Sequence, residues 1–313
     1  MSIERDIVVI GAGLTGLAAA HSLTEAGRDV LVIDKGRQHG GRMAHRERDG
    51  FGFDHGTPWV EAEEGGFADF LAKAERSGAA KRLAKAPSRV AGMPDMTALP
   101  GTLAVGVEIR QGVVVSGVER HGTRWKIDTS EGPVRARHLI CAVPAPQAEA
   151  LLPEIREALS EVTMEPGWTL MAAFEAPLGV DAPEWPDNGA RVIREPAKPG
   201  RPEAPEAWTM HAPLNWAREN LERDREEIVP DLLRMLGNAM GRRLPKPIHA
   251  RAHRWRYSRT GRPLGHPFLK RDRLHVGGDW CLGPLAEDAY ASGMAIAEDI
   301  LGAVRGTDGV AAS

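Results

Sequence analysis

The sequence predicts a mixed α/β protein with two lobes, α+β at the level of the whole chain, in which a nucleotide-binding domain is assembled from separated segments. A strand–turn–helix–strand unit occupies residues 6–34, and a second glycine-rich turn follows a short strand near residue 277. The chain has 313 residues, which is longer than a single hydrophobic core usually supports, and its hydrophobic content of 42% is enough for a substantial core. These three observations favour one nucleotide-binding lobe and a second lobe.

The first unit has the spacing of a dinucleotide-binding turn. Residues 6–10 form an apolar strand, and Gly11, Gly13 and Gly16 make a G-x-G-x-x-G turn that opens a helix. Gly11 permits the tight turn, Gly13 lets a pyrophosphate approach the backbone, and Gly16 lets the helix pack on the strand. The helix N-terminus offers free N–H groups and a partial positive charge to phosphates.

The segment after this helix indicates which dinucleotide binds. Gly27 ends the helix, residues 30–33 form the second strand, and the carboxylate of Asp34 can accept hydrogen bonds from both ribose hydroxyls. A glycine doublet at 40–41 then brings further amides to the pyrophosphate, and Arg42 can pair with it bidentately. A plain surface loop of Gly and Arg is the alternative. Together with the first turn, the doublet and the arginine favour FAD over NAD.

The remaining elements follow from hydrophobic periodicity and turn residues. They are a strand and turn at 51–56, a helix at 67–78, strands at 113–118, 124–129 and 134–143, a helix at 147–162, a strand at 191–194, two helical segments within 214–241, a strand at 248–257, a strand at 274–276 and a helix at 287–304. The Pro-rich stretch 183–205 is otherwise predicted to be loop, and the residues after 304 to be frayed.

The C-terminal part carries a second dinucleotide-type element. Gly277, Gly278 and Asp279 follow the strand at 274–276 and precede a helix rich in small residues. Asp279 can hold a ribityl chain or, through water, the pyrophosphate. The amides of Ala289 and Tyr290 at the helix start can face the flavin pyrimidine carbonyl and stabilise the anion formed on hydride uptake. An ordinary capped helix is the alternative, and the first motif makes it weaker.

Composition excludes several classes of protein. A net charge of −3 gives no reason to expect nucleic acid or an anionic membrane surface as a partner. Cys141 and Cys281 are far apart without metal-ligand spacing, which suits a reducing compartment. No apolar run reaches the ~18 residues of a spanning helix, and the first strand leaves no room for a signal peptide. We therefore expect a cytoplasmic protein that binds no metal.

No nucleophile triad, carboxylate pair or metal cluster is visible, so no catalytic residue is assigned. His211 and His253 are interpreted as hydrogen-bonded strand histidines rather than ligands.

The chain resembles the bacterial renalase group of the flavin amine-oxidase-like superfamily. The resemblance runs along nearly the whole sequence: VVIGAGLTGLAAA at 8–20, DKGRQHGGRM at 34–43, DHG at 54–56, AVPAPQA at 142–148, MEPGW at 164–168, AAFEAPL at 172–178, HRWRY at 253–257, GDWC at 278–281 and EDAYASG at 287–293. It implies non-covalent FAD, so Cys281 is expected to be a packing residue.

The resemblance also implies a domain division and a set of cofactor-binding residues. Residues 1–80, 101–150 and 265–304 would form a discontinuous Rossmann-type FAD-binding domain, residues 81–100 and 151–264 a mixed sheet-and-helix substrate domain, and residues 305–313 a flexible tail. The expected FAD-binding residues are Gly11, Ala12, Gly13, Leu14, Thr15, Gly16, Asp34, Lys35, Gly41, Arg42, Met43, Gly56, Thr57, Val115, Gly278, Asp279, Ala289 and Tyr290.

The activity implied is oxidation of 2- or 6-dihydro isomers of NAD(P)H. Hydride passes to flavin N5, and O2 is the final acceptor, giving NAD(P)+ and H2O2. Because pyridinium aromaticity drives the hydride loss, the protein needs mainly a flat slot against the flavin. Trp59, Arg254 and Tyr290 are candidates to face the substrate.

Three departures from the renalase pattern leave alternatives open. Pro58 replaces a usual Gln, Tyr290 replaces a usual Trp, and Asp288 replaces a usual Gly. A carboxylate at Asp288 suits a small cationic amine, although it can equally be a favourable charge at a helix N-terminus. A flavin amine oxidase and a non-catalytic flavin-binding redox module are therefore alternatives. An NAD-only dehydrogenase explains neither the glycine doublet nor Asp279. The sequence carries no prediction of oligomeric state.

Overall fold

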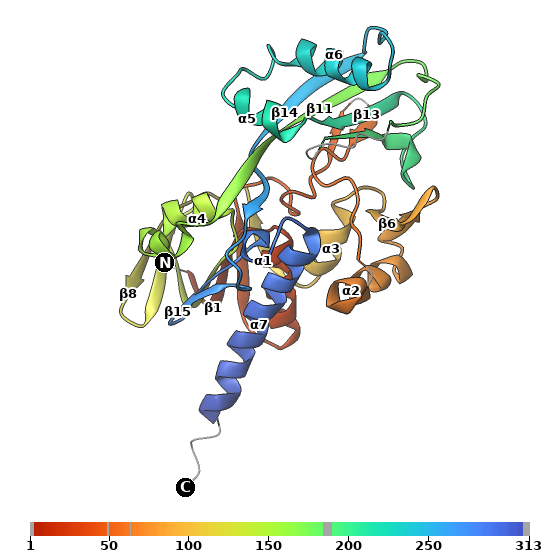
Figure 1. The fold of residues 1–313 in the computed structure, drawn as a ribbon. Helices are drawn as coiled ribbons and strands as arrows, with labels where there is room; N and C mark the ends of the chain where they lie inside the picture. Colours follow the sequence, from red (N-terminus) through yellow and green to blue (C-terminus); the bar gives the residue numbers. More distant parts are fainter. Residues whose placement is uncertain (1–2, 49, 63, 184–189, 309–313) are drawn as a thin grey trace. The chain divides into compact units, whose positions relative to one another are not determined.

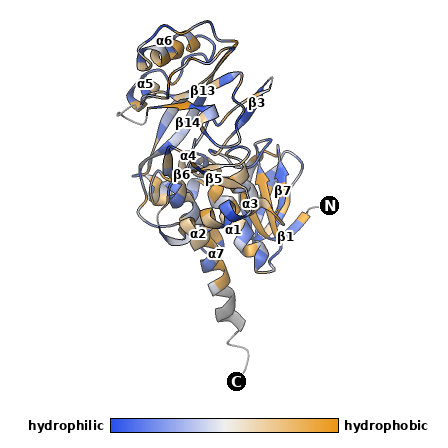
Figure 2. Ribbon diagram, turned by 90° about the vertical axis from the view of Figure 1, so that its right-hand side faces the viewer, coloured by the Kyte–Doolittle hydropathy of each residue, from blue (hydrophilic) through white to orange (hydrophobic). Residues whose placement is uncertain are grey.

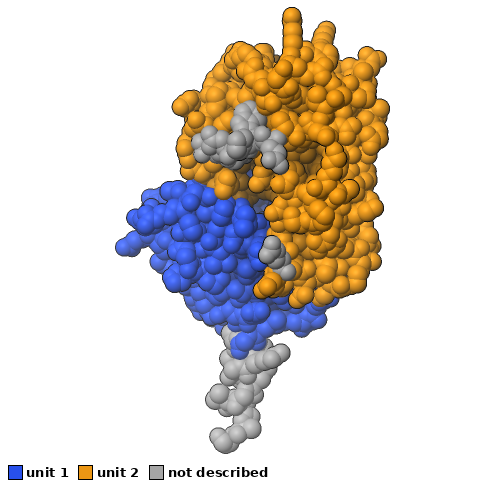
Figure 3. Space-filling model, turned by 45° about the vertical axis from the view of Figure 1, so that its right-hand side comes forward, with its two compact units in different colours: residues 1–41, 100–164, 260–313 blue, residues 42–99, 165–259 orange. Residues whose placement is uncertain are grey.

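The computed structural model describes residues 3–48, 50–62, 64–183 and 190–308. The chain divides into two compact units, coloured separately in Figure 3. Unit 1 comprises residues 1–41, 100–164 and 260–313, and unit 2 comprises residues 42–99 and 165–259. The helix α3 (Ala98–Ala104) and the strands β11 (Thr163–Phe174) and β14 (His249–Arg262) each cross a boundary between the units.

Unit 1 is built on an eight-stranded sheet (Figure 1). Its elements are β1 (Ile3–Ile10), α1 (Leu14–Glu25), β2 (Val30–Asp34), β7 (Glu108–Gln111), β8 (Val115–His121), β9 (Arg124–Thr129), β10 (Val134–Cys141), α4 (Ala145–Leu151), η1 (Pro153–Ile155), η2 (Glu157–Leu159), β15 (Leu269–Arg271), β16 (Leu274–Val276), η4 (Asp279–Cys281) and α7 (Ala286–Asp308). The strand order is β15-β16-β10-β1-β2-β7, parallel from β16 to β7. The hairpin β8–β9 joins β10 in antiparallel fashion, as β15 joins β16.

The parallel strands form apolar runs because both of their faces are covered. Ile7, Val8 and Val9 of β1 are fully buried, as is the neighbouring β2 residue Val32, and the apolar colouring gathers beside the β1 label in Figure 2. The carboxyl ends of β1, β2, β10 and β16 share one edge of this sheet, which is where parallel α/β sheets bind ligands.

The first and last helices of unit 1 pack directly against each other. The Thr15 hydroxyl of α1 donates a hydrogen bond to the Ala289 carbonyl of α7 at 2.8 Å. A Cβ at Gly293 would overlap the Thr15 carbonyl oxygen, so this glycine lets the two helices approach closely. Segments separated by more than 270 residues therefore meet beside the glycine-rich turn.

Unit 2 contains a four-stranded sheet of order β12-β13-β11-β14 and two short hairpins, β3–β4 and β5–β6. Its remaining elements are β3 (Arg46–Arg48), β4 (Phe51–Phe53), α2 (Gly65–Arg76), β5 (Ala80–Leu83), β6 (Ala86–Gly92), β12 (Arg191–Arg194), η3 (Glu195–Ala197), β13 (Glu206–His211), α5 (Leu214–Glu219) and α6 (Val229–Ala239). The helices α5 and α6 cover one face of the sheet, where Trp168 and Leu170 of β11 pack with Leu232 and Leu236. On its other face Met171 and Ala173 pack with the phenylalanines of β4.

The predicted fold class is confirmed, and several elements differ from prediction. The helix expected at 147–162 is wrong beyond Leu151, because Leu152 leaves the helical conformation (φ −134°, ψ 71°) and two short 3-10 turns follow. Pro153 causes this break, since it disfavours the helical conformation at the residue before it. The strand at 191–194 is confirmed, while residues 184–189 of the predicted loop lie outside the described residues.

The C-terminal helix is longer than expected, and the domain division is left as a prediction. α7 continues to Asp308, whereas residues 309–313 of the predicted tail lie outside the described residues. Residues 42–80, expected to belong with the FAD-binding segments, lie in compact unit 2. Compactness does not test which residues bind cofactor, so the functional division stays a prediction.

Candidate functional site

The glycine-rich turn of unit 1 is fixed by close backbone packing. Gly11 has φ +106°, and a Cβ there would lie 2.5 Å from the Ala142 carbonyl oxygen. A Cβ at Gly16 would overlap the Gly11 carbonyl oxygen. Neither position accepts another residue without a backbone shift, because φ and space both exclude a side chain at Gly11 and space excludes one at Gly16.

Gly13 differs from these two glycines because a Cβ there would meet no atom of the described chain within 4 Å. It is the N-cap of α1, with φ −77° and ψ 179°, and no described side chain caps the helix. The first helical N–H groups therefore lack intrahelical partners. Open space beside uncapped amides is what an approaching pyrophosphate requires.

The carboxylate of Asp34, at the end of β2, anchors the turn. Its Oδ2 accepts a hydrogen bond from the Ala12 amide at 2.6 Å, and its Oδ1 accepts one from the Gly36 amide at 2.5 Å. Each carboxylate oxygen keeps a further lone pair for a ribose hydroxyl.

Three other predicted residues of unit 1 lie close to this strand end. The Gly40 amide donates to the Ala12 carbonyl at 2.8 Å, and a Cβ at Gly41 would lie 3.2 Å from the Gly13 Cα. Lys35 reaches Gln147 at 3.2 Å. Val115 begins β8 just after Val113, whose amide donates to the Asp34 carbonyl at 3.0 Å. The turn, the glycine doublet and the strand expected to meet adenine are thus brought together.

The second glycine turn lies at the end of β16 in the same unit. A Cβ at Gly277 would lie 2.7 Å from the Ser292 hydroxyl of α7, which in turn accepts a hydrogen bond from the Gly278 amide at 3.1 Å. Asp279 is 3% exposed, and its Oδ2 accepts a hydrogen bond from the Thr260 hydroxyl at 3.0 Å. This contact orients the carboxylate that we expected to hold the ribityl chain.

Burial raises the pKa of the adjacent Cys281 thiol to about 12. The thiol therefore stays protonated at neutral pH, consistent with the packing role expected for it.

Asp288 completes the N-terminus of α7. Its Oδ2 accepts a hydrogen bond from the Leu285 amide at 2.8 Å, which is the N3-to-N-cap half of a capping box. Burial raises the pKa of Asp288, and the charge of Asp279 acts in the same direction, while the Leu285 hydrogen bond opposes both.

The residues of unit 1 fit FAD by three independent features. Gly13 leaves free space at an uncapped helix N-terminus, Asp34 stands at the end of the second strand, and Asp279 is oriented near the start of α7. The predicted residues Leu14, Thr15, Ala289 and Tyr290 lie on the two packed helices α1 and α7.

Four further predicted cofactor residues lie in unit 2. The Arg42 carbonyl accepts a hydrogen bond from the Thr57 amide at 2.8 Å, and a Cβ at Gly56 would overlap that same carbonyl oxygen. The Arg42 guanidinium donates to the Ser258 carbonyl at 3.3 Å, and Met43 is 3% exposed. Gly56 is required here because the two chain segments run in contact.

Asp54, of the DHG sequence, is the centre of a buried charge network that sequence reasoning missed. The Asp54 carboxylate accepts hydrogen bonds from Lys198 and Arg201, both at 2.5 Å, from the Met96 amide at 3.0 Å and from His45 at 2.9 Å. Burial alone would raise the pKa of Asp54, but the charges of Lys198 and Arg201 and the hydrogen bonds hold it well below its usual range.

A second carboxylate completes this network. Glu195 contacts Lys198 at 2.5 Å and accepts a hydrogen bond from the Thr209 hydroxyl at 2.6 Å. Burial raises the pKa of Glu195 despite these partners. The partners of Asp54 lie up to 147 residues away along the chain, so no local sequence pattern could have identified them.

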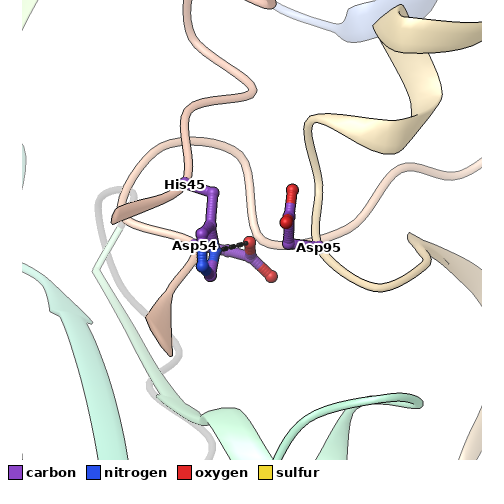
Figure 4. A group of neighbouring side chains, drawn as sticks. All are labelled: His45, Asp54 and Asp95. Carbon is purple, nitrogen blue, oxygen red and sulfur yellow. Dashed lines mark hydrogen bonds and ion pairs between the residues drawn. The ribbon is translucent and has the colours of Figure 1, made fainter. Parts of the chain in front are cut away.

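His45, Asp54 and Asp95 place one potential ligand atom each within 4.8 Å of one another (Figure 4). Burial lowers the pKa of His45, but the hydrogen bond and charge of Asp54 outweigh it and the net shift is upward. The ammonium of Lys198 and the guanidinium of Arg201 already neutralise Asp54, which disfavours a bound cation.

Beside this network, His55, His253 and Trp255 form a cluster of rings. The centroid of the His55 ring lies 4.8 Å from that of His253 and 5.4 Å from that of Trp255, the latter pair being stacked at 24°. Burial lowers the pKa of His55 to about 4 and that of His253 to about 3. Burial also lowers the pKa of His211 to about 3. The rings are therefore neutral at pH 7.

The predicted substrate residues of unit 2 lie in different surroundings. Arg254 donates to the Leu221 carbonyl at 3.0 Å and lies 3.5 Å from Glu222, so its charge is already engaged. Trp59 is half-buried, with the guanidinium carbons of Arg89 and Arg191 over its ring at 4.5 and 5.5 Å from the centroid. Tyr290, the third candidate, is half-buried on α7 of unit 1.

Among the helices within the described ranges, none has both the length and the apolar character needed to cross a bilayer.

Two family models match the chain. The model described as flavin containing amine oxidoreductase matches residues 63–301, and the model described as NAD(P)-binding Rossmann-like domain matches residues 9–74. The first of these covers well over half of the chain.

Curated relatives match over short segments. Carotenoid 3,4-desaturase of Haloarcula japonica is 48% identical over 55 residues, which are 18% of this chain and 11% of that protein. Putrescine oxidase of Kocuria rosea is 41% identical over 63 residues, which are 20% of this chain and 13% of that protein. The matched segments thus span only a small part of either relative.

Solved structures match over almost the whole chain. A putative protoporphyrinogen oxidase from Exiguobacterium sp. 255-15 has a TM-score of 0.72 at 15% identity, covering 96% of this chain and 99% of that one. Cyclohexylamine oxidase from Brevibacterium oxydans IH-35A has a TM-score of 0.71 at 14% identity, with the same coverage of both chains. At these identities the likeness establishes the fold alone.

Proposed function

The chain belongs to the flavin-containing amine oxidoreductase family, and we propose that its reaction within this family is renalase-like. It is an FAD-dependent oxidoreductase, so the predicted cofactor class and enzyme class are confirmed. The proposed reaction takes a 2- or 6-dihydro isomer of NAD(P)H, a proton and O2, and gives NAD(P)+ and H2O2. Bound FAD supplies the hydride acceptor.

The position of Asp288 carries this proposal over the amine-oxidase alternative. A free carboxylate would favour a small cationic amine, and Asp288 is the acidic residue that departs from the renalase pattern. Its carboxylate is engaged with the Leu285 amide at 2.8 Å, as a helix-capping group. The one substitution that suggested an amine substrate therefore has a structural explanation.

The protein's own groups have modest tasks in this reaction. The α1 N-terminus, Asp34, Arg42 and Asp279 hold the cofactor, and Val115 meets its adenine ring. No proton has to be removed from the donor carbon, so the lack of an assigned catalytic base is consistent with the reaction.

We further propose that residues 1–80, 101–150 and 265–304 serve cofactor binding and residues 81–100 and 151–264 serve substrate binding. Trp59, Arg254 and Tyr290 are the proposed substrate-facing residues. A flavin amine oxidase acting on a small amine is the second candidate, supported by the relatives named putrescine oxidase and cyclohexylamine oxidase.

Anaerobic stopped-flow spectroscopy of the FAD-bound protein tests the proposal. The protein is mixed separately with 2- and 6-dihydro isomers of NADH, with ordinary NADH and with a panel of primary amines and polyamines. We expect rapid flavin bleaching by a dihydro isomer alone, and the Asp288→Ala variant should bleach at the same rate. Bleaching by an amine that disappears in Asp288→Ala would replace our proposal with the amine-oxidase alternative.

A further inference from the structure

Trp59 is flanked by arginines whose positive charge is only partly balanced by neighbouring carboxylates. The backbones of Val60 and Val90 form a two-way bridge, with N–H to O distances of 2.9 and 2.8 Å, which sets Trp59 beside Arg89. The Arg89 guanidinium carbon lies 4.5 Å from the indole centroid, and that of Arg191, at the start of β12, lies 5.5 Å from it. Both arginines and the indole belong to unit 2.

The charges around this indole do not cancel. Arg89 is paired with Glu61 at 3.0 Å. The side chains of Arg191 and Arg259 make no ion pair or hydrogen bond with any residue in the described part of the chain. Burial lowers the pKa of Arg191, and the positive charges of Arg259 and Arg89 lower it further while Glu61 raises it. The three cations Arg89, Arg191 and Arg259 thus face two carboxylates, Glu61 and Glu165, and Glu165 is already paired with Arg218 at 2.6 Å.

Stacking on an indole leaves the binding edge of a guanidinium open. An arginine uses its flat face for the ring and keeps its N–H fork for a bidentate anion such as phosphate. Because the stacked guanidinium is already oriented, less side-chain freedom is lost when the anion binds. The same cluster repels an ammonium group.

We propose that Trp59, Arg89 and Arg191 form a phosphate-binding subsite that takes the diphosphate of a reduced pyridine dinucleotide and excludes cationic amines. This inference rests on the proposed function and assigns the subsite that recognises its substrate. Arg259 adds to the positive charge that acts on Arg191.

The experiment compares two donors that differ only beyond the nicotinamide riboside. Anaerobic flavin reduction is measured with 6-dihydro-NAD, which carries the diphosphate, and with 6-dihydronicotinamide riboside, which carries no phosphate. Wild type, Arg191→Gln, Arg191→Lys and a matched control, Arg234→Gln, are compared. Arg234 lies on α6 of the same unit, is 69% exposed and pairs only with Asp231 in the described chain.

We expect Arg191→Gln to raise the dinucleotide Kd about 10- to 100-fold through loss of charge-assisted hydrogen bonds. Arg191→Lys, which keeps the charge but not the fork, should fall between wild type and Arg191→Gln. The riboside Kd should not change in any variant, and Arg234→Gln should match wild type. Inorganic pyrophosphate should compete with the dinucleotide in wild type and much less in Arg191→Gln.

Equal Kd values for dinucleotide and riboside in wild type, or an unchanged dinucleotide Kd in Arg191→Gln, would overturn the subsite. If no dihydropyridine reduces the flavin, the proposed function fails instead. The subsite is then tested alone, by calorimetric titration of the FAD-bound protein with inorganic pyrophosphate. Binding that weakens in Arg191→Gln but not in Arg234→Gln would support it, and absence of such binding would overturn it.

Discussion

The Asp54 network makes the sharpest prediction about stability. Asp54→Asn keeps the shape of the side chain but removes its charge, leaving the cations Lys198 and Arg201 with the single carboxylate of Glu195. An amide nitrogen would also face donors that now lie 2.5 Å from the carboxylate. Breaking a buried ion pair by removing one partner typically costs about 3–5 kcal/mol. We expect the free energy of unfolding to fall by that amount, measured by urea denaturation followed by tryptophan fluorescence.

Two further variants separate charge from geometry in this experiment. Asp181→Asn is the matched control, because its ion pair with Lys85, at 3.0 Å, joins side chains that are both 83% exposed, and it should cost less than about 1 kcal/mol. Asp54→Asn combined with Arg201→Met removes the cation that loses its carboxylate, keeps the Lys198–Glu195 pair, and should recover part of the loss. A loss below 1 kcal/mol in Asp54→Asn, or a double variant no more stable than the single one, would refute the charge argument.

Two other predictions concern the cofactor turn and pH. Gly13→Ala should leave the stability of the cofactor-free protein within about 0.5 kcal/mol of wild type, since its Cβ meets no described atom within 4 Å and φ is −77°. The same variant should weaken FAD binding at least about tenfold in a fluorescence titration, because the space beside Gly13 is proposed for the pyrophosphate. Gly302→Ala, at a position on α7 where a Cβ also meets no atom within 4 Å, is the control. Unchanged FAD affinity in Gly13→Ala would contradict the assignment. For pH, the pKa of His55 is lowered to about 4 by burial, so between pH 4 and 6.5 the unfolded chain binds a proton that the folded chain does not. The free energy of unfolding should therefore rise with pH across that window, by at most about 3 kcal/mol from this residue. In urea titrations at a series of pH values, His55→Gln should make this rise smaller. An identical pH dependence in the variant would show that His55 is not the cause.

The nucleotide-binding unit was accessible from sequence because its determinants are local. One short segment contains β1, β2, the glycines between them and Asp34. Each of these residue types is needed there for a distinct backbone conformation or hydrogen bond. The second turn at Gly278 and Asp279 was found for the same reason. Local chemistry therefore located both turns of unit 1.

The elements that the sequence prediction missed or placed wrongly have identifiable physical reasons. β11 was not predicted because Trp168, Leu170, Met171 and Ala173 are buried on both faces of the sheet, so the strand shows no alternation. Pro166 near its start also argues against a strand, since proline cannot donate to the ladder. The helix expected at 147–162 was extended through Pro153 on periodicity alone.

The Asp54 network of unit 2 could not be predicted from any local sequence pattern. Asp54 stood out only as part of a short DHG sequence, while Lys198 and Arg201 lie in a Pro-rich stretch expected to be loop. Their pairing depends on tertiary contact across more than 140 residues. The arginines around Trp59 come from β6 and β12, which are likewise distant in sequence.

The packing of α1 against α7 has a consequence for synthesis in the cell. Thr15 is synthesised 274 residues before its partner Ala289, and β16 adds to an edge of β10 that is synthesised long before it. A nascent chain emerging from the ribosome would carry β1 and β10 with that parallel edge unpaired until residues 274–276 follow. Such an edge is a template for wrong pairing. Protection of this edge thus has to wait for β16, and a ribosome-stalled chain that ends before β16 would be prone to aggregate.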